Sequence, residues 1–132
     1  MILPLEHQVA PLKESIRLRE LGMPQETYFW WVEFRNILLN DSNKIFKMLV
    51  DFEECLKTEQ SNYIKDFHKY AAPNVAELGW LLREDWANNR FAGDCWVYSY
   101  GYGDNDQIKA NTQAEAMALR LIYLVEKGDI KF

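Results

Sequence analysis

The residues of this sequence that most often carry out chemistry do not form a known catalytic or metal-binding pattern. His7 and His68 are far apart in the chain and have no cysteine pair beside them, whereas zinc sites place their ligands at short, fixed spacings. Cys55 and His68 could act as a nucleophile and its base. However, Cys55 lies next to Leu56 in a segment with helical spacing, where a free cysteine is usually a small core residue. We therefore predict no catalytic residue, no metal and no cofactor.

Two glycine- and aspartate-rich motifs begin like ligand-binding loops and then depart from them. Gly101 and Gly103 match the first two glycines of a dinucleotide-binding loop, but Asp106 occupies the third position, where its charge would repel a phosphate. Residues 104–106 offer oxygens to Ca²⁺, but Lys109 stands where a calcium loop needs glycine. A solvated turn is the simpler interpretation of this segment.

The sequence pattern that stands out most clearly is an alternation of aromatic side chains. Four large side chains alternate onto one face of a strand predicted over residues 95–102, namely Trp96, Tyr98, Tyr100 and Tyr102. Such a face either packs under a helix or forms a binding surface. A helix about 10 Å wide does not cover four same-face positions, which span about 20 Å. We therefore predict that Trp96 and Tyr98 are buried, and that Tyr100 and Tyr102 are accessible and form the binding site.

The elements that position these residues are indicated by apolar spacing and by signals at their ends. A helix is predicted over residues 11–21 because Gly22 follows as its C-terminal cap. An aromatic strand is predicted over residues 27–34. Capping boxes, in which Asn or Thr is followed three residues later by Glu, predict a short helix after Asn74 and a long helix over residues 112–127.

The middle of the chain has the spacing of two further helices. Apolar residues recur at helical intervals over residues 45–56, and Asp41 offers an N-cap before them. Similar spacing predicts another helix over residues 61–70, which Pro73 would end.

The second half of the chain is predicted to contain a hairpin. Residues 83–93 are polar and predict a loop, and residues 107–110 predict a short strand that returns beside the aromatic one. The fold class is therefore α+β, with a small antiparallel sheet of about three strands and helices packed mainly on one of its faces. No linker or repeat divides the sequence, so residues 1–132 are expected to form a single domain.

The composition favours a globular protein and disfavours nucleic acid as a partner. Hydrophobic residues make up 48% of the 132 residues, which is enough for a core. The net charge is −5 and the basic residues are dispersed, so nucleic-acid binding is disfavoured. No apolar run is long enough to span a bilayer and no signal peptide is evident, so we predict a cytoplasmic protein with no membrane contact. In that compartment Cys55 and Cys95 are free thiols, although the sequence leaves open whether they lie close together.

Three segments of the chain resemble one protein family. These segments are residues 18–25, residues 72–79 and residues 112–128 with their Ala-Glu-Ala core. Together they resemble a family of small uncharacterised proteins of bacterial phages, prophages and other mobile elements. Residues 41–70 do not share the resemblance, and Trp80 departs from it. The resemblance implies a mobile-element protein in a bacterial cytoplasm, and it implies no activity, ligand or functional residue.

These observations lead to three hypotheses about function. The first is a non-enzymatic adaptor that binds another protein or a second copy of itself. The second is an enzyme with an unconventional site, which would use Cys55 or the acidic turn at residues 104–106. The third is a weak binder of single-stranded nucleic acid that stacks bases on aromatic side chains. A flat aromatic patch would favour the first hypothesis, a deep polar pocket the second, and an aromatic patch ringed by Lys and Arg the third.

Overall fold

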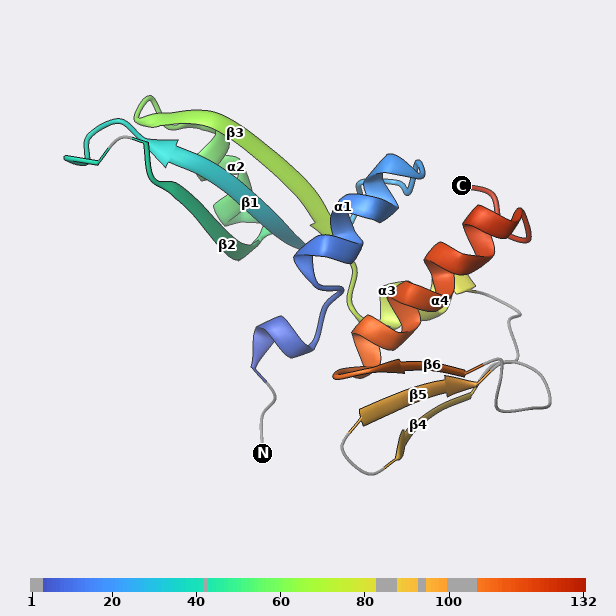
Figure 1. The fold of residues 1–132 in the computed structure, drawn as a ribbon. Coiled ribbons are helices and arrows are strands. Elements are labelled where there is room, and N and C mark those ends of the chain that lie inside the picture. Colours follow the sequence, from blue (N-terminus) through green and yellow to red (C-terminus); the bar gives the residue numbers. More distant parts are fainter. Residues whose placement is uncertain (1–3, 42, 83–87, 93–94, 100–106) are drawn as a thin grey trace.

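The computed structural model describes the backbone of residues 4–41, 43–82, 88–92, 95–99 and 107–132, and the side chains of residues 4–41, 43–82 and 110–132. The predicted α+β class with a small three-stranded antiparallel sheet is confirmed. The described residues form two such sheets, one in each half of the chain, with helices packed against them (Figure 1). None of the described helices has the length and apolar character needed to cross a membrane.

The first sheet consists of β1 (Phe29–Asn36), β2 (Ile45–Asp51) and β3 (Ile64–Ala72), in the order β2-β1-β3. β1 is antiparallel to both of its neighbours. Helix α2 (Phe52–Gln60) connects β2 to β3 and lies behind the sheet in Figure 1. β2 and β3 are therefore parallel to each other, with β1 inserted between them.

The helices predicted over residues 45–56 and 61–70 are wrong in most of their length, because both segments begin or continue as strands. Helix α2 starts only at Phe52, where the Asp51 carboxylate accepts a hydrogen bond from the Glu54 N–H at 2.9 Å. Both strands carry apolar side chains on each of their two faces, and such strands contain apolar pairs three or four residues apart that imitate helical spacing. Here pairing with β1 decides the conformation of both segments, and this pairing overrides local propensity.

The second sheet consists of β4 (Asn88–Ala92), β5 (Cys95–Ser99) and β6 (Gln107–Ala110), with β5 in the middle. The predicted aromatic strand is confirmed over residues 95–99, and the predicted return strand is confirmed as β6. The predicted loop over residues 83–93 is wrong for β4, which pairs with β5 in antiparallel register. The residues of β4 are mostly polar, so the sequence contains no strand signal for them. β4 is an edge strand, and it is stabilised mainly by its backbone hydrogen bonds with β5.

The helices with explicit end signals lie where the sequence predicts them. The helix predicted over residues 11–21 is α1 (Leu12–Glu20), and a short 3₁₀ turn, η1 (Leu5–His7), precedes it. Helix α3 (Val75–Leu82) begins with a complete capping box. In this box the Asn74 N–H donates to Glu77 Oε1 at 2.9 Å, and the Glu77 N–H donates to Asn74 Oδ1 at 2.8 Å.

Helix α4 (Gln113–Lys127) is the longest helix and packs on the second sheet, on α3 and on α1. Thr112 Oγ1 accepts a hydrogen bond from the Glu115 N–H at 3.1 Å at its start. Gly128 ends the helix at φ +93°, a left-handed conformation that glycine adopts without steric cost. The predicted capping box and C-terminal glycine are both confirmed.

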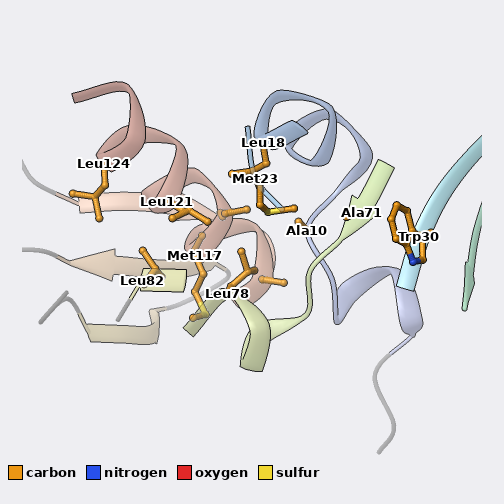
Figure 2. Close-up of a cluster of buried hydrophobic side chains, with 14 of the residues drawn as sticks. Ala10, Leu18, Met23, Trp30, Ala71, Leu78, Leu82, Met117, Leu121 and Leu124 are labelled. Carbon is orange, nitrogen blue, oxygen red and sulfur yellow. The ribbon is translucent and has the colours of Figure 1, made fainter. Parts of the chain in front are cut away.

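A single cluster of buried apolar side chains connects the two halves of the molecule (Figure 2). Leu18 of α1 and the following Met23 lie between the first sheet and the pair of helices α3 and α4. Leu121, in the middle of α4, is fully buried. Leu124 is buried as well, whereas Val125 is only partly buried.

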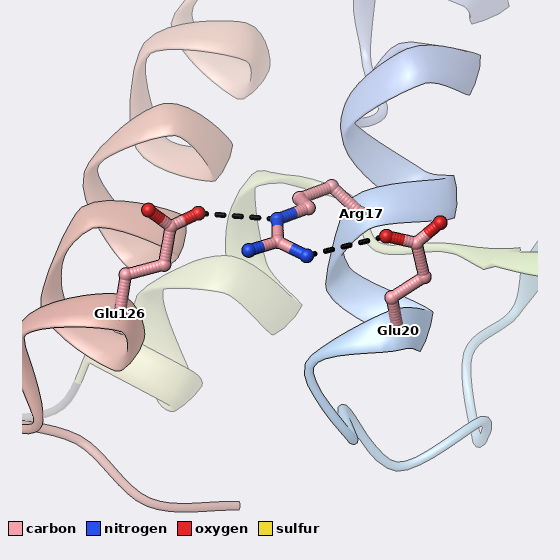
Figure 3. Close-up of polar contacts among 3 residues, drawn as sticks. All are labelled: Arg17, Glu20 and Glu126. Atoms are coloured by element: carbon pink, nitrogen blue, oxygen red, sulfur yellow. Dashed lines mark hydrogen bonds and ion pairs between the residues drawn. The ribbon is translucent and has the colours of Figure 1, made fainter.

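An exposed ion-pair network connects α1 to α4 at the surface of this cluster (Figure 3). Arg17 Nε donates to Glu126 Oε1 at 3.1 Å, and Arg17 Nη1 donates to Glu20 Oε2 at 3.2 Å. The two hydrogen bonds raise the pKa of the guanidinium above its ordinary value. Because all three side chains are exposed, the network contributes little to stability.

Candidate interaction surface

The predicted binding residues, Tyr100 and Tyr102, lie outside the described residues. Trp96 and Tyr98 lie in β5, of which the structure describes the backbone and not the side chains. The predicted division of this aromatic strand into a buried and an accessible end therefore stays a prediction.

A different surface stands out at the far end of the first sheet. Five large apolar or aromatic side chains are exposed there, and we call them the apolar tip: Ile37, Leu38, Leu39, Ile45 and Tyr63. Leu38 is the most exposed of them at 64%. The Ile37 N–H donates to the Tyr63 backbone oxygen at 3.0 Å, so the turns at the ends of β1 and α2 lie side by side. Figure 1 shows this end of the sheet pointing away from α3 and α4, so no other described element covers it.

The turn that carries the tip is held by hydrogen bonds of its own. Asn36 accepts the Leu38 N–H through Oδ1 at 3.0 Å and the Leu39 N–H through its backbone oxygen at 3.3 Å. Asp41 was predicted to cap a helix, and instead its backbone oxygen accepts the Lys44 N–H at 3.2 Å, just before β2. The apolar side chains are therefore presented by a turn that has backbone and side-chain hydrogen bonds of its own.

The base of the tip is stiffened by aromatic and ionic contacts. The rings of Phe34 and Phe46 stack across β1 and β2 at a centroid distance of 5.6 Å, and Lys44 Nζ lies 5.1 Å above the Phe46 ring. On the other edge, Arg35 forms an ion pair with Asp66. Asp66 lies at a bulge of β3 with φ +54°, which turns its carboxylate toward β1.

An open hollow of about 380 Å³ lies beside the tip, on the sheet face opposite α2. Its lining includes Glu33, Arg35, Ile45 and His68. The strand register places Lys47, Glu33 and His68 in one row across the three strands, so groups of opposite charge are neighbours. This arrangement offers hydrogen bonds and ion pairs at the margin of an apolar surface.

The other end of the same sheet face is covered. Trp31 Nε1 donates to the Ala10 backbone oxygen at 2.9 Å, and the Arg19 guanidinium lies 5.2 Å above the ring of Tyr70. Burial, together with the nearby Glu33 carboxylate, raises the pKa of Tyr70 above its ordinary value. The accessible part of this face is therefore the part that borders the tip.

The hypothetical pair of Cys55 and His68 is separated by the sheet. Cys55 belongs to α2, and its side chain is buried between this helix and the sheet. The sheet face that α2 covers also carries Lys69, whose ammonium pairs with Glu59 of α2 at 3.0 Å. Successive strand residues point to opposite faces, so His68 lies on the other side. Burial raises the pKa of the Cys55 thiol; the nearby Lys69 ammonium offsets part of this rise, and the Glu59 carboxylate adds to it. His68 is therefore not placed to act as a base for Cys55, and the raised pKa disfavours the thiolate.

We expect Cys55 of the folded protein to react slowly with iodoacetamide near pH 8. Its raised pKa lowers the thiolate fraction at any given pH, and α2 blocks access to the sulfur. Mass spectrometry of the Cys55 peptide, with and without guanidinium, measures the rate. The rate should rise sharply on unfolding, and equal rates in both conditions would contradict the burial.

A second hollow, of about 340 Å³, lies where η1, β1 and the starts of α3 and α4 meet. Its polar lining includes His7, Asn74, Asn111 and Thr112. Asn74 and Thr112 already accept N–H groups of their own helices, so these helix starts are capped from within. Burial and the nearby Glu14 raise the pKa of Glu115 in this region.

Within the part of the chain that the structure describes, no three His, Cys, Asp or Glu side chains are grouped so that they could hold a metal ion. No family model, curated protein or solved structure matches this chain. The apolar tip is not indicated by periodicity. The signal that could have found it is the run of three apolar residues, Ile37 to Leu39, directly before the turn-forming Asn40 and Asp41.

Proposed function

We propose that this protein is a non-enzymatic protein-binding protein and that it binds its partner with the apolar tip. The observation that supports this proposal is the exposure of Ile37, Leu38 and Leu39, three consecutive large apolar residues on a hydrogen-bonded, projecting turn. Single exposed apolar side chains are common on protein surfaces. A consecutive exposed run is not, because it promotes association unless it serves a binding function.

The margin of the tip indicates the chemistry of the partner. Lys44, Lys47 and Lys65 are exposed at its base, whereas the chain as a whole carries a net charge of −5. Protein interfaces combine an apolar centre with a polar margin that favours the correct partner. Because Glu33 and Asp66 also lie at this margin, we expect the partner to be a protein with an apolar patch bordered by charged groups of both signs. Given the family resemblance, we place this interaction in a phage or another mobile element of a bacterium.

The proposal predicts that charge at the tip abolishes partner binding. We expect Leu38→Asp to weaken capture of a specific partner by more than about tenfold, as expected of a residue at the centre of an interface. Stability should stay within about 0.5 kcal/mol of wild type, because Leu38 is exposed. The measurement is affinity capture from the native host by the wild-type and variant proteins, with mass spectrometry to quantify each captured protein.

The matched control is Phe132→Asp, which places the same charge at another exposed apolar residue, near the C-terminus. It should capture the partner as wild type does. Equal capture by Leu38→Asp would refute the assignment of the tip. Two further measurements test whether the tip binds a second copy of the chain or a lipid surface instead. In sedimentation, a wild-type dimer that Leu38→Asp dissociates would identify a second copy as the partner. In vesicle flotation, binding of the wild type to anionic vesicles would identify a lipid surface.

A further inference from the structure

A third hollow, separate from the two described above, forms a groove at the opposite end of the first sheet from the apolar tip. It has a volume of about 360 Å³ and is lined by Thr27, Tyr28, Asp51, Phe52 and Glu53. Tyr28 is 61% exposed and Phe52 is 48% exposed, so two aromatic rings border the same open space. We call this site the aromatic–acidic groove.

The backbone places Tyr28 and Phe52 at the same end of the sheet. Phe29 is paired with Asp51 at the end of the β1–β2 register; Tyr28 directly precedes Phe29, and Phe52 directly follows Asp51 as the first residue of α2. The Tyr28 N–H donates to Glu77 Oε2 of α3 at 3.2 Å, and its ring meets the Phe29 ring edge-on at 4.8 Å. The start of α2 is fixed in turn by the Asp51 cap. The groove is therefore preformed.

The charge around the rings is negative. Asp51 and Glu53 line the groove, Glu54 follows in the first turn of α2, and the lining contains no Lys, Arg or His. The Glu77 carboxylate lies at the Tyr28 backbone. The carboxylates of Asp51, Glu53 and Glu54 lie at the N-terminus of α2, where the partial positive charge of the helix dipole stabilises them. Their summed negative charge exceeds this partial positive charge, so the groove is negative overall.

Some other aromatic rings of the described residues already lie beside a cation of the chain itself. Arg19 lies over Tyr70, Lys44 over Phe46 and Lys69 over Trp30, at 5.1 to 5.5 Å from the ring centroids. In the same part of the chain, no cation of the protein lies over Tyr28 or Phe52. The groove thus combines aromatic rings and carboxylates, both of which attract a cation, and none of the described residues that line it supplies one.

We propose that the aromatic–acidic groove binds a lysine or arginine side chain from a basic segment of a protein partner. The aliphatic part of that side chain packs between the rings of Tyr28 and Phe52, with the cation against their faces. The carboxylates of Asp51 and Glu53 accept its N–H groups. This site goes beyond the function proposed for the apolar tip, because it lies at the other end of the sheet and binds a cationic side chain rather than an apolar patch.

The test uses acetylated, amidated tetralysine and tetraglutamate peptides, titrated into the ¹⁵N-labelled full chain and followed by NMR. Tetralysine should shift the amide signals of Tyr28, Phe52 and Glu53, and tetraglutamate should not. Phe52→Leu keeps the apolar volume and removes the ring, so it should weaken tetralysine binding by about threefold. Tyr28→Phe keeps a ring and should bind like wild type.

Charge-matched variants separate the groove from general attraction to an acidic protein. Glu53→Gln should weaken binding, whereas Asp129→Asn, which removes the same charge at the far end of α4, should not. Equal loss in both variants, unchanged binding in Phe52→Leu, or no binding of tetralysine at millimolar concentration would each overturn the proposal. Leu38→Asp should leave tetralysine binding intact, so the groove and the apolar tip are tested independently.

Discussion

Replacing Trp30 by alanine is expected to lower the free energy of unfolding by about 3–5 kcal/mol, as for other large aromatic side chains removed from a core. Trp30 is only 4% exposed and lies in the central strand of the first sheet, where Val50 and Ala71 flank it on the same face. Its Nε1–H donates to the Thr27 backbone oxygen at 3.0 Å, and Lys69 Nζ lies 5.5 Å from its ring. The substitution therefore leaves a cavity and removes the donor to a backbone carbonyl.

The measurement is denaturant unfolding followed by circular dichroism, with Trp80→Ala as the matched control. Trp80 is 79% exposed on α3, so its loss should change stability by less than about 0.5 kcal/mol. A similar small loss for Trp30→Ala would show that the first sheet does not pack around this side chain.

Leu121→Ala is expected to cost about 2–5 kcal/mol, the range for a fully buried leucine whose site collapses only in part. Leu121 has no exposed surface and lies in the middle of α4, among Leu18, Leu78 and Met117 (Figure 2). Leu38→Ala removes the same atoms at a 64% exposed position and should cost less than about 0.5 kcal/mol. A loss below half a kcal/mol for Leu121→Ala would place the buried face of α4 elsewhere.

Trp30 and Leu121 belong to one buried cluster although they lie in different halves of the chain. We therefore expect each substitution to shift a single unfolding transition that both halves share. A separate early transition in Leu121→Ala, with the first sheet still folded, would show that Leu18 and Met23 do not couple the two halves.

The elements that the sequence predicts correctly are those whose deciding partners are close in the chain. The capping boxes at Asn74 and Thr112 each include a glutamate three residues later, so the signal for each helix start lies within four consecutive residues. Residues 45–51 and 64–72 depend instead on pairing with β1, which contributes residues 29–36. Local spacing contains no information about that pairing, and the helices predicted there are wrong for this reason.

The same distinction applies to the candidate sites. The aromatic alternation that singled out Tyr100 and Tyr102 is a local pattern, and its outcome lies outside the described residues. The apolar tip depends on where a turn projects after three strands have assembled, and the aromatic–acidic groove depends on the β1–β2 register. Neither position follows from residue types alone, although the run Ile37 to Leu39 could have indicated the first.

The insertion of β1 between β2 and β3 has a consequence for the growing chain on the ribosome. β1 and β2 are joined by a short turn and pair as soon as both have emerged, but the second edge of β1 stays unpaired until residues 64–72 follow α2 out of the exit tunnel. At translation rates of about 5–20 residues per second, residues 52–72 take about 1–4 s to be made. For that interval an aromatic strand edge is open to any neighbouring chain. Polysomes, where nascent copies are crowded, are therefore where this protein is most exposed to strand exchange.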